Sequence, residues 1–240
     1  MTRTVEPPAL TRSWTGLHVH LAWSGEHADT FLVGSIAPLM NSLRATGRLA
    51  DWYFQRDRTH LRLRLRGADW YTVRALRADL TRLATAADFP LVGEHDHGVV
   101  RQVAYEPRTE VFGGPGAMPV AEDVFCRSTD LALQVLALAP TKFDAARTVV
   151  AATVIALGHG GDTAADPALT RWVNAVQRSR RKLGDDPSEP VAGRWLGVWS
   201  AHLNLLLNRL GLDPQEVRDL VAKSPLAPYG PRVGSGVWDD

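Results

Sequence analysis

The residues best suited to chemistry form one alternating run, His60-Leu61-Arg62-Leu63-Arg64-Leu65-Arg66. A period of two is typical of a strand, so His60 and the three arginines share one face while the leucines share the other. Side chains on one face of a strand stand about 7 Å apart, which places the guanidiniums at fixed spacing. The leucine face requires a core, whereas a partly buried guanidinium requires a carboxylate or an anionic ligand. We call Arg62, Arg64 and Arg66 the arginine row.

Two other interpretations of the arginine row are open. It could be the face of an exposed edge strand whose charges prevent pairing with other chains. Together with the aromatic run Trp52-Tyr53-Phe54 it could also bind single-stranded nucleic acid by stacking and charge. The net charge of +1 and the lack of a long basic track disfavour nucleic acid as a partner.

A second polar group lies on a helix predicted over about 193–210, which also carries His202 and Arg209. Ser200, Asn204 and Asn208 recur every four residues and therefore share one stripe of this helix. An apolar stripe runs beside it, made of Leu203, Leu206, Leu207 and Leu210. The polar stripe faces a cleft, solvent or a second copy of the chain, and the pattern alone does not choose among these.

Metal and nucleotide sites are disfavoured. His18 and His20 lie on one face of a predicted strand, but a metal site needs further ligands at suitable spacing. A strand face packed under a helix or lining a cleft is the preferred interpretation. The segment 94–98, Glu-His-Asp-His-Gly, is interpreted as a solvated turn, and the glycines at 113–116 lack the Lys-Ser/Thr of a phosphate-binding loop.

The predicted elements place these residues in an α+β fold. Strands are predicted at 17–23, 51–56, 60–66 and 99–105. An early helix begins with Ser35 as its cap and ends at Gly47, and another contains Val73, Leu76, Leu80 and Leu83. Later helices are predicted at about 119–138, 143–157, 167–183, 193–210 and 213–222. This order predicts a mainly antiparallel sheet from the N-terminal half, packed with a C-terminal helical layer.

Length and composition indicate one domain. We expect an N-terminal arm over 1–13, a single catalytic domain over 14–223 and a tail rich in Pro and Gly over 224–240. Cys126 is the only cysteine, so no disulfide can form within the chain, and we expect an inert packed thiol. The absence of a signal peptide or an apolar run of transmembrane length predicts a soluble, cytoplasmic protein.

Several motifs in a fixed order resemble one family. They are Trp14…Leu17-His18-Val19-His20, Pro38-Leu39…Leu43…Gly47, Trp52-Tyr53-Phe54…Arg56…His60-Leu61-Arg62-Leu63-Arg64, Tyr105-Glu106-Pro107…Phe112-Gly113-Gly114 and Asn208-Arg209-Leu210-Gly211. The set resembles the C-terminal, glutamate-eliminating domain of lantibiotic dehydratases and their stand-alone relatives, the thiopeptide-type bacteriocin biosynthesis proteins. The resemblance covers nearly the whole chain.

The resemblance implies one of two reactions on a modified precursor peptide, neither of which needs an organic cofactor. One eliminates glutamate from glutamylated Ser or Thr. The other is pyridine synthesis, in which two dehydroalanines join by a formal [4+2] cycloaddition and water and the leader peptide are then lost. A third possibility is a peptide-binding subunit that retains the fold without the chemistry.

Two positions favour pyridine synthesis. Where the eliminating enzymes have an arginine before the Gly-Gly pair, this chain has Val111, and where they have a histidine it has Asn204, with His202 close by. Elimination needs a base and a cation for the departing carboxylate, whereas cycloaddition gains most from orientation, which can supply about 7–11 kcal/mol.

The resemblance and the residue types together predict a site. Its catalytic residues are Tyr105, Glu106, Ser200 and His202, and its substrate-binding residues are Tyr53, His60, Arg62, Arg64 and Asn204. No metal or other cofactor is expected. The expected partners are a precursor peptide with leader and dehydrated core, and other enzymes of the same pathway, without nucleic acid or membrane.

Overall fold

A computed structural model describes residues 13–20, 25–57, 59–86, 99–138, 167–183, 194–213, 215–217 and 219. The chain divides into two compact units, residues 1–105 and 106–240. The predicted arm (Ser13 apart), the turn at 94–98, the helix at 143–157 and the tail at 224–240 lie outside the described residues, and the helix at 213–222 is described only in part.

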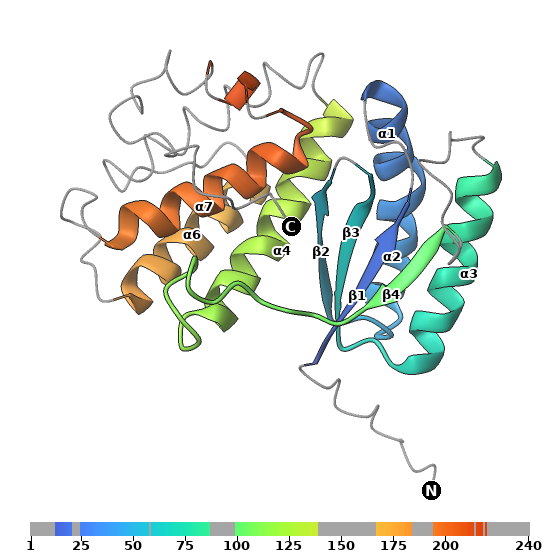
Figure 1. Ribbon diagram of the computed structural model, residues 1–240, viewed down its shortest axis with the longest axis horizontal. Helices are drawn as coiled ribbons and strands as arrows, with labels where there is room; N and C mark the ends of the chain where they lie inside the picture. The colour runs from blue at the N-terminus through green and yellow to red at the C-terminus, as the bar shows by residue number, and fades with distance from the viewer. Residues whose placement is uncertain are drawn as a thin grey trace, which may run out of the picture. The chain divides into compact units, whose positions relative to one another are not determined.

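The first unit contains a four-stranded antiparallel sheet in the order β2-β3-β1-β4 (Figure 1). The strands are β1 (Trp14–Val19), β2 (Asp51–Arg56), β3 (Leu61–Arg66) and β4 (Val100–Val103). β1 and β3 are the central strands, since each pairs with a neighbour on both sides. The strand β3 coincides with the predicted alternating run, and β2 has its predicted bounds. The antiparallel sheet and the helices confirm the α+β class.

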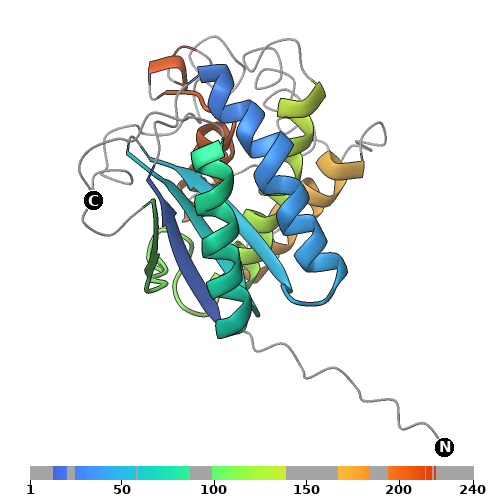
Figure 2. The same cartoon turned by 90° about the vertical axis from the view of Figure 1, so that its right-hand side faces the viewer.

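Two helical connections cover the same face of this sheet (Figures 1 and 2). The first runs through α1 (Gly25–Phe31), the π-helical segment η1 (Leu32–Ile36) and α2 (Ala37–Ala45), and the second is α3 (Trp70–Ala86). The element order β-α-β-β-α-β with this strand order is the split βαβ arrangement of ferredoxin-like folds.

Strand alternation explains why the sheet has one apolar and one polar face. Leu61, Leu63 and Leu65 are fully buried, whereas the arginines between them are only half-buried. The helices contribute buried residues to the same apolar layer, among them Leu32, Ile36, Met40, Val73, Leu76 and Leu80. Of the helices that the structure describes in the first unit, none covers the opposite face, which carries the arginine row (Figure 1).

Three predicted boundaries were wrong. β1 begins at Trp14, three residues before the predicted start, because Gly16 breaks the apolar pattern without breaking the pairing. Ser35 is not a helix cap, because it lies inside η1 and the helix continues from α1 into α2. β4 ends at Val103 rather than at 105, because its pairing with β1 ends at Gly16. The end at Gly47 was right, since its φ of 69° is the left-handed conformation that follows a helix.

In the second unit the described helices are α4 (Met118–Leu138), α6 (Pro167–Lys182) and α7 (Arg194–Arg209). α4 packs against α6 and α7, and their shared core includes Trp172, Leu203 and Leu206. The predicted apolar stripe of α7 is confirmed, since all four leucines are buried. Cys126 is a buried free thiol in α4, as expected.

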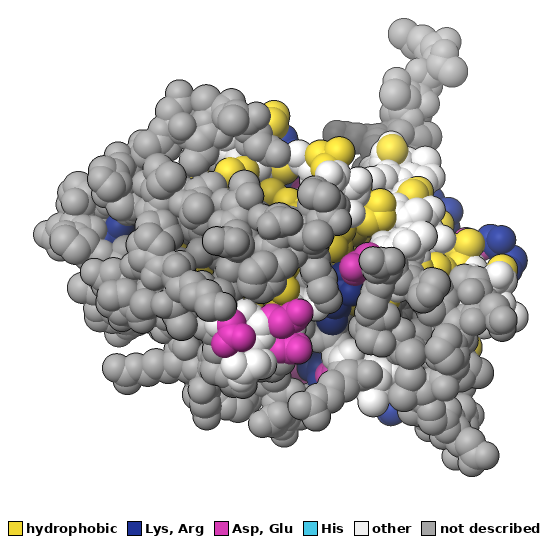
Figure 3. Space-filling view, turned by 90° about the horizontal axis from the view of Figure 1, so that it is seen from above, with side chains coloured by type: hydrophobic (Ala, Val, Ile, Leu, Met, Phe, Trp, Pro, Cys, Tyr) yellow, Lys and Arg dark blue, Asp and Glu magenta, His cyan; other side chains and the backbone are white. Residues whose placement is uncertain are grey.

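The described surface carries charges of both signs. Figure 3 shows basic and acidic side chains next to each other on one face of the molecule, in keeping with a net charge of +1. In the described part of the chain, no helix has the length and apolar character needed to cross a membrane.

Candidate functional site

The arginine row lies in the middle of the sheet. β3 pairs with β2 on one side and β1 on the other, so the interpretation of the row as an exposed edge was wrong. Directly opposite residues of an antiparallel pair share a face. Arg62 therefore lies between Gln55 and His18, Arg64 between Tyr53 and Gly16, and Arg66 between Asp51 and Trp14.

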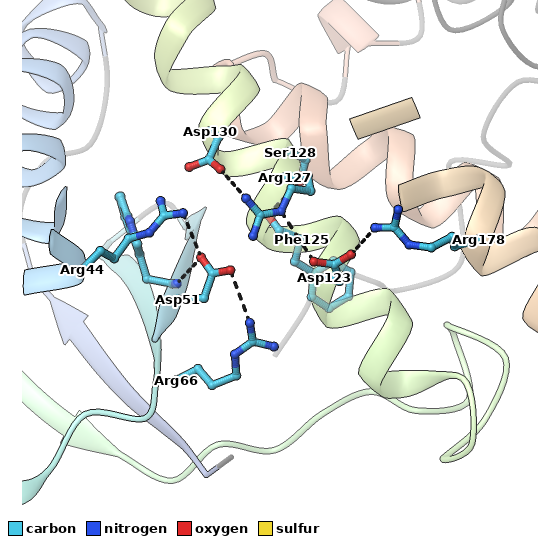
Figure 4. A network of polar contacts seen from close by, with 10 residues as sticks. Arg44, Asp51, Arg66, Asp123, Phe125, Arg127, Ser128, Asp130 and Arg178 are labelled. Atoms are coloured by element: carbon cyan, nitrogen blue, oxygen red, sulfur yellow. Dashed lines mark hydrogen bonds and ion pairs between the residues drawn. The ribbon is translucent and has the colours of Figure 1, made fainter. Parts of the chain in front are cut away.

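Arg66 is neutralised within the first unit. Its Nη2 donates to Asp51 Oδ2 over 3.3 Å, and Arg44 Nη2 lies 3.7 Å from Asp51 Oδ1 (Figure 4). Asp51 is only 3% exposed and also accepts the backbone N–H of Trp52 over 3.0 Å. The guanidinium carbon of Arg66 lies 5.4 Å from the ring centroid of Trp14. Because its charge is already paired inside the sheet, we interpret Arg66 as a structural residue.

Arg62 is held by a carboxylate and an imidazole. Its Nη2 donates to Asp57 Oδ2 over 2.6 Å, and its Nε donates to His60 Nε2 over 3.2 Å. Burial raises the pKa of Asp57, but the nearby charges of His60 and Arg62 outweigh burial and lower it overall. Because Nε2 of His60 accepts a hydrogen bond, the proton of its neutral ring is on Nδ1, which lies 3.0 Å from Thr59 Oγ1.

Arg64 is the member of the row with no carboxylate partner among the described residues. Its Nη1 donates to the backbone oxygen of Leu63 over 3.2 Å. A Cβ on Gly16 would lie only 2.8 Å from that Nη1, so the glycine leaves the space that the guanidinium occupies. Burial lowers the pKa of Arg64, while Tyr53 and Tyr105 raise it. An arginine side chain nevertheless stays charged at neutral pH, so this cation is available to a ligand.

Two predicted tyrosines surround Arg64 together with an aromatic residue that sequence analysis did not assign to the site. The Trp14 ring lies 5.2 Å from the Tyr53 ring and 5.5 Å from the Tyr105 ring. The predicted residues Tyr53, Arg64 and Tyr105 therefore come together on the first unit, at the polar face of the sheet. Tyr105 lies just beyond the end of β4.

Three imidazoles cluster at the other end of the row. The ring of His18 stacks on His60 at 4.2 Å, and the ring of His20 lies 5.2 Å from His60. Burial, followed by the neighbouring histidine and arginine charges, lowers the pKa of His18 to about 3. Burial likewise lowers the pKa of His60 to about 4, although Asp57 opposes it. Within the described ranges, no three His, Cys, Asp or Glu side chains are arranged to hold a metal ion.

The other predicted residues belong to the second unit. Glu106 is exposed at its start. Ser200 and Asn204 are half-buried on one stripe of α7, as the spacing predicted. Val111 is half-buried in the turn segment before α4, in the position where the resemblance leads one to expect an arginine.

His202 is buried in an aromatic environment. It is 2% exposed, and its ring lies 5.1 Å from Phe112 and 5.6 Å from Phe125. In the part of the chain that the structure describes, neither ring nitrogen has a hydrogen-bond partner. Burial, followed by the charge of Arg209, lowers the pKa of His202 to about 3. A neutral imidazole with so low a pKa is a weak base.

Buried polar groups lie near His202 on the facing helices. Arg209 is fully buried and its Nη1 donates to Ser128 Oγ over 2.9 Å, and Ser128 in turn donates to the backbone oxygen of Phe125 over 3.0 Å. Nearby on α4, Arg127 bonds Asp130 over 3.0 Å (Figure 4). Sequence analysis noted Arg209 on the helix but had no signal for its partner, which comes from a helix about eighty residues earlier.

Sequence analysis also left Gly16 and Trp14 out of the site. The only available signal was a glycine in the first residues of an apolar strand, which often marks a close approach of another group. The strand order that puts Gly16 opposite Arg64 could not be derived from the pattern.

The chain is similar in sequence to one known protein family. The family described as the C-terminal part of lantibiotic biosynthesis dehydratases matches residues 14–189. No curated protein matches the chain by sequence.

Solved structures share the fold at low identity. The tRNA-dependent lantibiotic dehydratase MibB from Microbispora sp. 107891 is similar over 89% of this chain, with a TM-score of 0.62 and 17% identity. The chain spans only 27% of that protein. The pyridine synthase TbtD of thiomuracin biosynthesis is similar over 87% of this chain and 97% of its own, with a TM-score of 0.54 and 15% identity. Because the family match covers most of the sequence and the fold agrees, this chain belongs to the lantibiotic dehydratase C-terminal family.

Proposed function

We propose that this chain is a pyridine synthase that acts on a dehydrated precursor peptide. It would join two dehydroalanines by a formal [4+2] cycloaddition and then release water and the leader peptide, leaving a pyridine ring. The observation that carries the proposal is the polar face of the sheet, where Arg64, which has no carboxylate partner among the described residues, lies among tyrosines and neutral imidazoles. The described residues of this face supply fixed hydrogen-bond donors for peptide carbonyl groups, and the pKa values of His18 and His60 there are too low for a strong base.

The distinction between the two family reactions rests on basicity. Glutamate elimination requires a group that removes the α-proton, and such a base works best when its pKa is near the operating pH. The imidazoles of His18, His60 and His202 have pKa values lowered to about 3, 4 and 3. They remain good hydrogen-bonding groups but poor bases, which favours a reaction driven by orientation.

Two residues that differ from the pattern of eliminating enzymes also bear on the choice. The residues Val111 and Asn204, which replace the arginine and histidine expected of eliminating enzymes, point in the same direction.

We assign roles on this basis. Arg62 and Arg64, with His60 and Tyr53, would orient peptide carbonyl groups through charge-assisted hydrogen bonds. Tyr105 and Glu106 would transfer the protons that accompany amide tautomerisation and loss of water. From α7, Ser200 and Asn204 would contact the peptide and His202 would act as a neutral hydrogen-bonding group. The partners would be the modified precursor peptide and the enzymes that dehydrate it.

Glutamate elimination is the second candidate, and Arg64 is the observation that favours it. A half-buried guanidinium with no carboxylate partner among the described residues suits the carboxylate of a glutamyl ester as well as a carbonyl oxygen. The third candidate is a peptide-binding subunit, in which the same site would bind the peptide without catalysing a reaction.

Intact mass spectrometry separates the three candidates. The purified chain is incubated with its precursor peptide in two forms, one fully dehydrated and one glutamylated. Loss of water and leader peptide from the dehydrated form supports the proposal. Loss of glutamate from the glutamylated form would replace the proposal with elimination, and binding without any product would leave the binding subunit.

Variants then test the site assignment. Arg64→Ala and Glu106→Gln should each lower the yield of product at least tenfold. Arg82→Ala is the matched control, because Arg82 is exposed on α3 and forms a surface ion pair with Asp79, three residues earlier. Unchanged turnover in both site variants would contradict the assignment.

A further inference from the structure

Two buried side-chain nitrogens on β1, one on each side of Gly16, have no hydrogen-bond partner among the described residues. They are the indole Nε1 of Trp14 and the imidazole Nε2 of His18. Buried side-chain nitrogens in folded proteins are nearly always bonded to protein or water, so an unpartnered one needs a physical explanation. Two such atoms on one strand, both on the face that carries the arginine row, indicate a group that the protein is built to bind.

Arg64 lies opposite the residue that separates Trp14 from His18 on this face. Trp14, Gly16 and His18 are successive residues on one face of β1, about 7 Å apart. The Arg64 Nη1 lies 2.8 Å from where a Cβ of Gly16 would be, which puts the guanidinium over the middle of the three. The N–H groups of Trp14 and Arg64 can only donate, and the Trp14 Nε1 has no acceptor among the described residues.

His18 can provide a third hydrogen-bond donor. The groups around it are cationic or neutral: Arg62 and Arg101 lie directly opposite on the two neighbouring strands, and His20, His60 and Arg64 are close. The acid next to His60, Asp57, is already bonded to Arg62. His18 is therefore neutral at physiological pH, and in the tautomer with its proton on Nε2 it presents an N–H to the same site.

We infer that Trp14 and His18 are further substrate-binding residues, whose ring N–H groups lie on either side of Arg64 along the strand and donate, as the guanidinium does, to oxygen acceptors of the peptide, carbonyls or a carboxylate. The inference deepens the proposed function and rests on its premise that the ligand is a modified peptide. Both side chains are half-buried rather than fully buried, so part of each ring is open to a ligand.

Trp14 has a packing role that must be separated from its N–H group. Its ring contacts Tyr53 and Tyr105 and lies under the Arg66 guanidinium. Trp14→Phe keeps an aromatic ring there and removes the donor. Trp52→Phe is the matched control, because Trp52 is on the opposite face of the same sheet and its Nε1 is also buried without a partner.

His18 allows a conservative rescue. Gln places an N–H near the position of the imidazole Nε2, whereas Leu fills similar space without a donor. If His18 only packs against His60, Leu and Gln should behave alike. If His18 donates a hydrogen bond to the ligand, Gln should retain binding that Leu loses.

Binding is measured apart from turnover. The probe is the full precursor peptide with one dehydroalanine replaced by alanine, which cannot close the ring, and a second probe is the glutamylated precursor. Titration calorimetry should show that Trp14→Phe and His18→Leu each weaken binding about threefold to tenfold, as expected for one hydrogen bond. Trp52→Phe and His18→Gln should change it less than about twofold. Circular dichroism confirms that each variant is folded.

The outcomes separate the two proposals. If the wild-type chain binds and converts only the glutamylated probe, the proposed cycloaddition fails, and the same variants test the inference on that probe. Equal effects of Trp14→Phe and Trp52→Phe, equal effects of His18→Leu and His18→Gln, or no binding of either probe to the wild type would overturn the inference.

Discussion

The burial of His202 makes the stability of the second unit depend on pH. Burial and the charge of Arg209 lower its pKa from 6.5 to about 3 in the folded state, whereas the unfolded chain keeps the usual value. Between these two values the unfolded state binds the proton and the folded state does not. Stability is therefore complete above about pH 6.5 and decreases as the pH falls toward 3.

The size of the effect follows from the two pKa values. At pH 5 the unfolded imidazole is almost fully protonated, 1.5 units below its own pKa, and each unit corresponds to about 1.4 kcal/mol. We expect His202 alone to reduce the free energy of unfolding by about 2 kcal/mol between pH 7 and pH 5. No reduction for solvent screening is needed, because the side chain is 2% exposed.

The assay is urea denaturation of the wild type and of His202→Leu at both pH values. Every other titrating group is common to the two proteins, so the difference between their pH effects isolates His202. Leu also removes two buried nitrogens without partners, so at pH 7 the variant should be at least as stable as the wild type. Equal pH effects in both proteins, or a native His202 that titrates near pH 6.5 by NMR, would refute the reasoning.

Two further predictions concern stability. Gly113→Ala should destabilise the chain by about 1–3 kcal/mol, because Gly113 has a φ of 92° and an added Cβ would lie 2.3 Å from Leu183 Cδ2. Gly116→Ala meets nothing within 4 Å and should leave the thermal midpoint nearly unchanged; a similar loss in both would contradict the packing argument. Asp51→Asn should cost about 3 kcal/mol in urea, because it leaves two arginines facing a buried neutral amide. Asp79→Asn removes an exposed ion pair and should lower the free energy of unfolding by less than about 0.5 kcal/mol. Equal losses in Asp51→Asn and Asp79→Asn would contradict the argument that burial makes the Asp51 ion pairs important.

The sequence was sufficient to predict the features that depend on a local pattern. The alternation through Arg62, Arg64 and Arg66 predicted β3, its two faces and its buried leucines, because burial of one face imposes a period of two. The four-residue spacing of Ser200 and Asn204 placed both on one half-buried stripe of α7. These features depend on neighbours within one element, so a single sequence contains them.

The features that could not be predicted from the sequence depend on which elements pack against one another. The strand order puts Gly16 beside Arg64, and nothing in either segment specifies that pairing. The segment η1 joins two helices where Ser35 suggested a beginning, because the apolar residues on both sides pack against one sheet face. The burial of His202 results from Phe112 and Phe125, which lie far from it in the chain.

The central position of β1 determines when the first unit can assemble. β1 is made first, yet its partners are β3 and β4, and the last of them ends at Val103. Contacts between segments so distant in sequence form slowly, since the intervening chain must first be closed into a loop. During synthesis one edge of β1 can pair once β3 is complete at Arg66, but the other edge stays open until β4 is complete at Val103, and an open edge is where strands pair with other chains. The polar face around Arg64 is complete only after β4 has paired with β1.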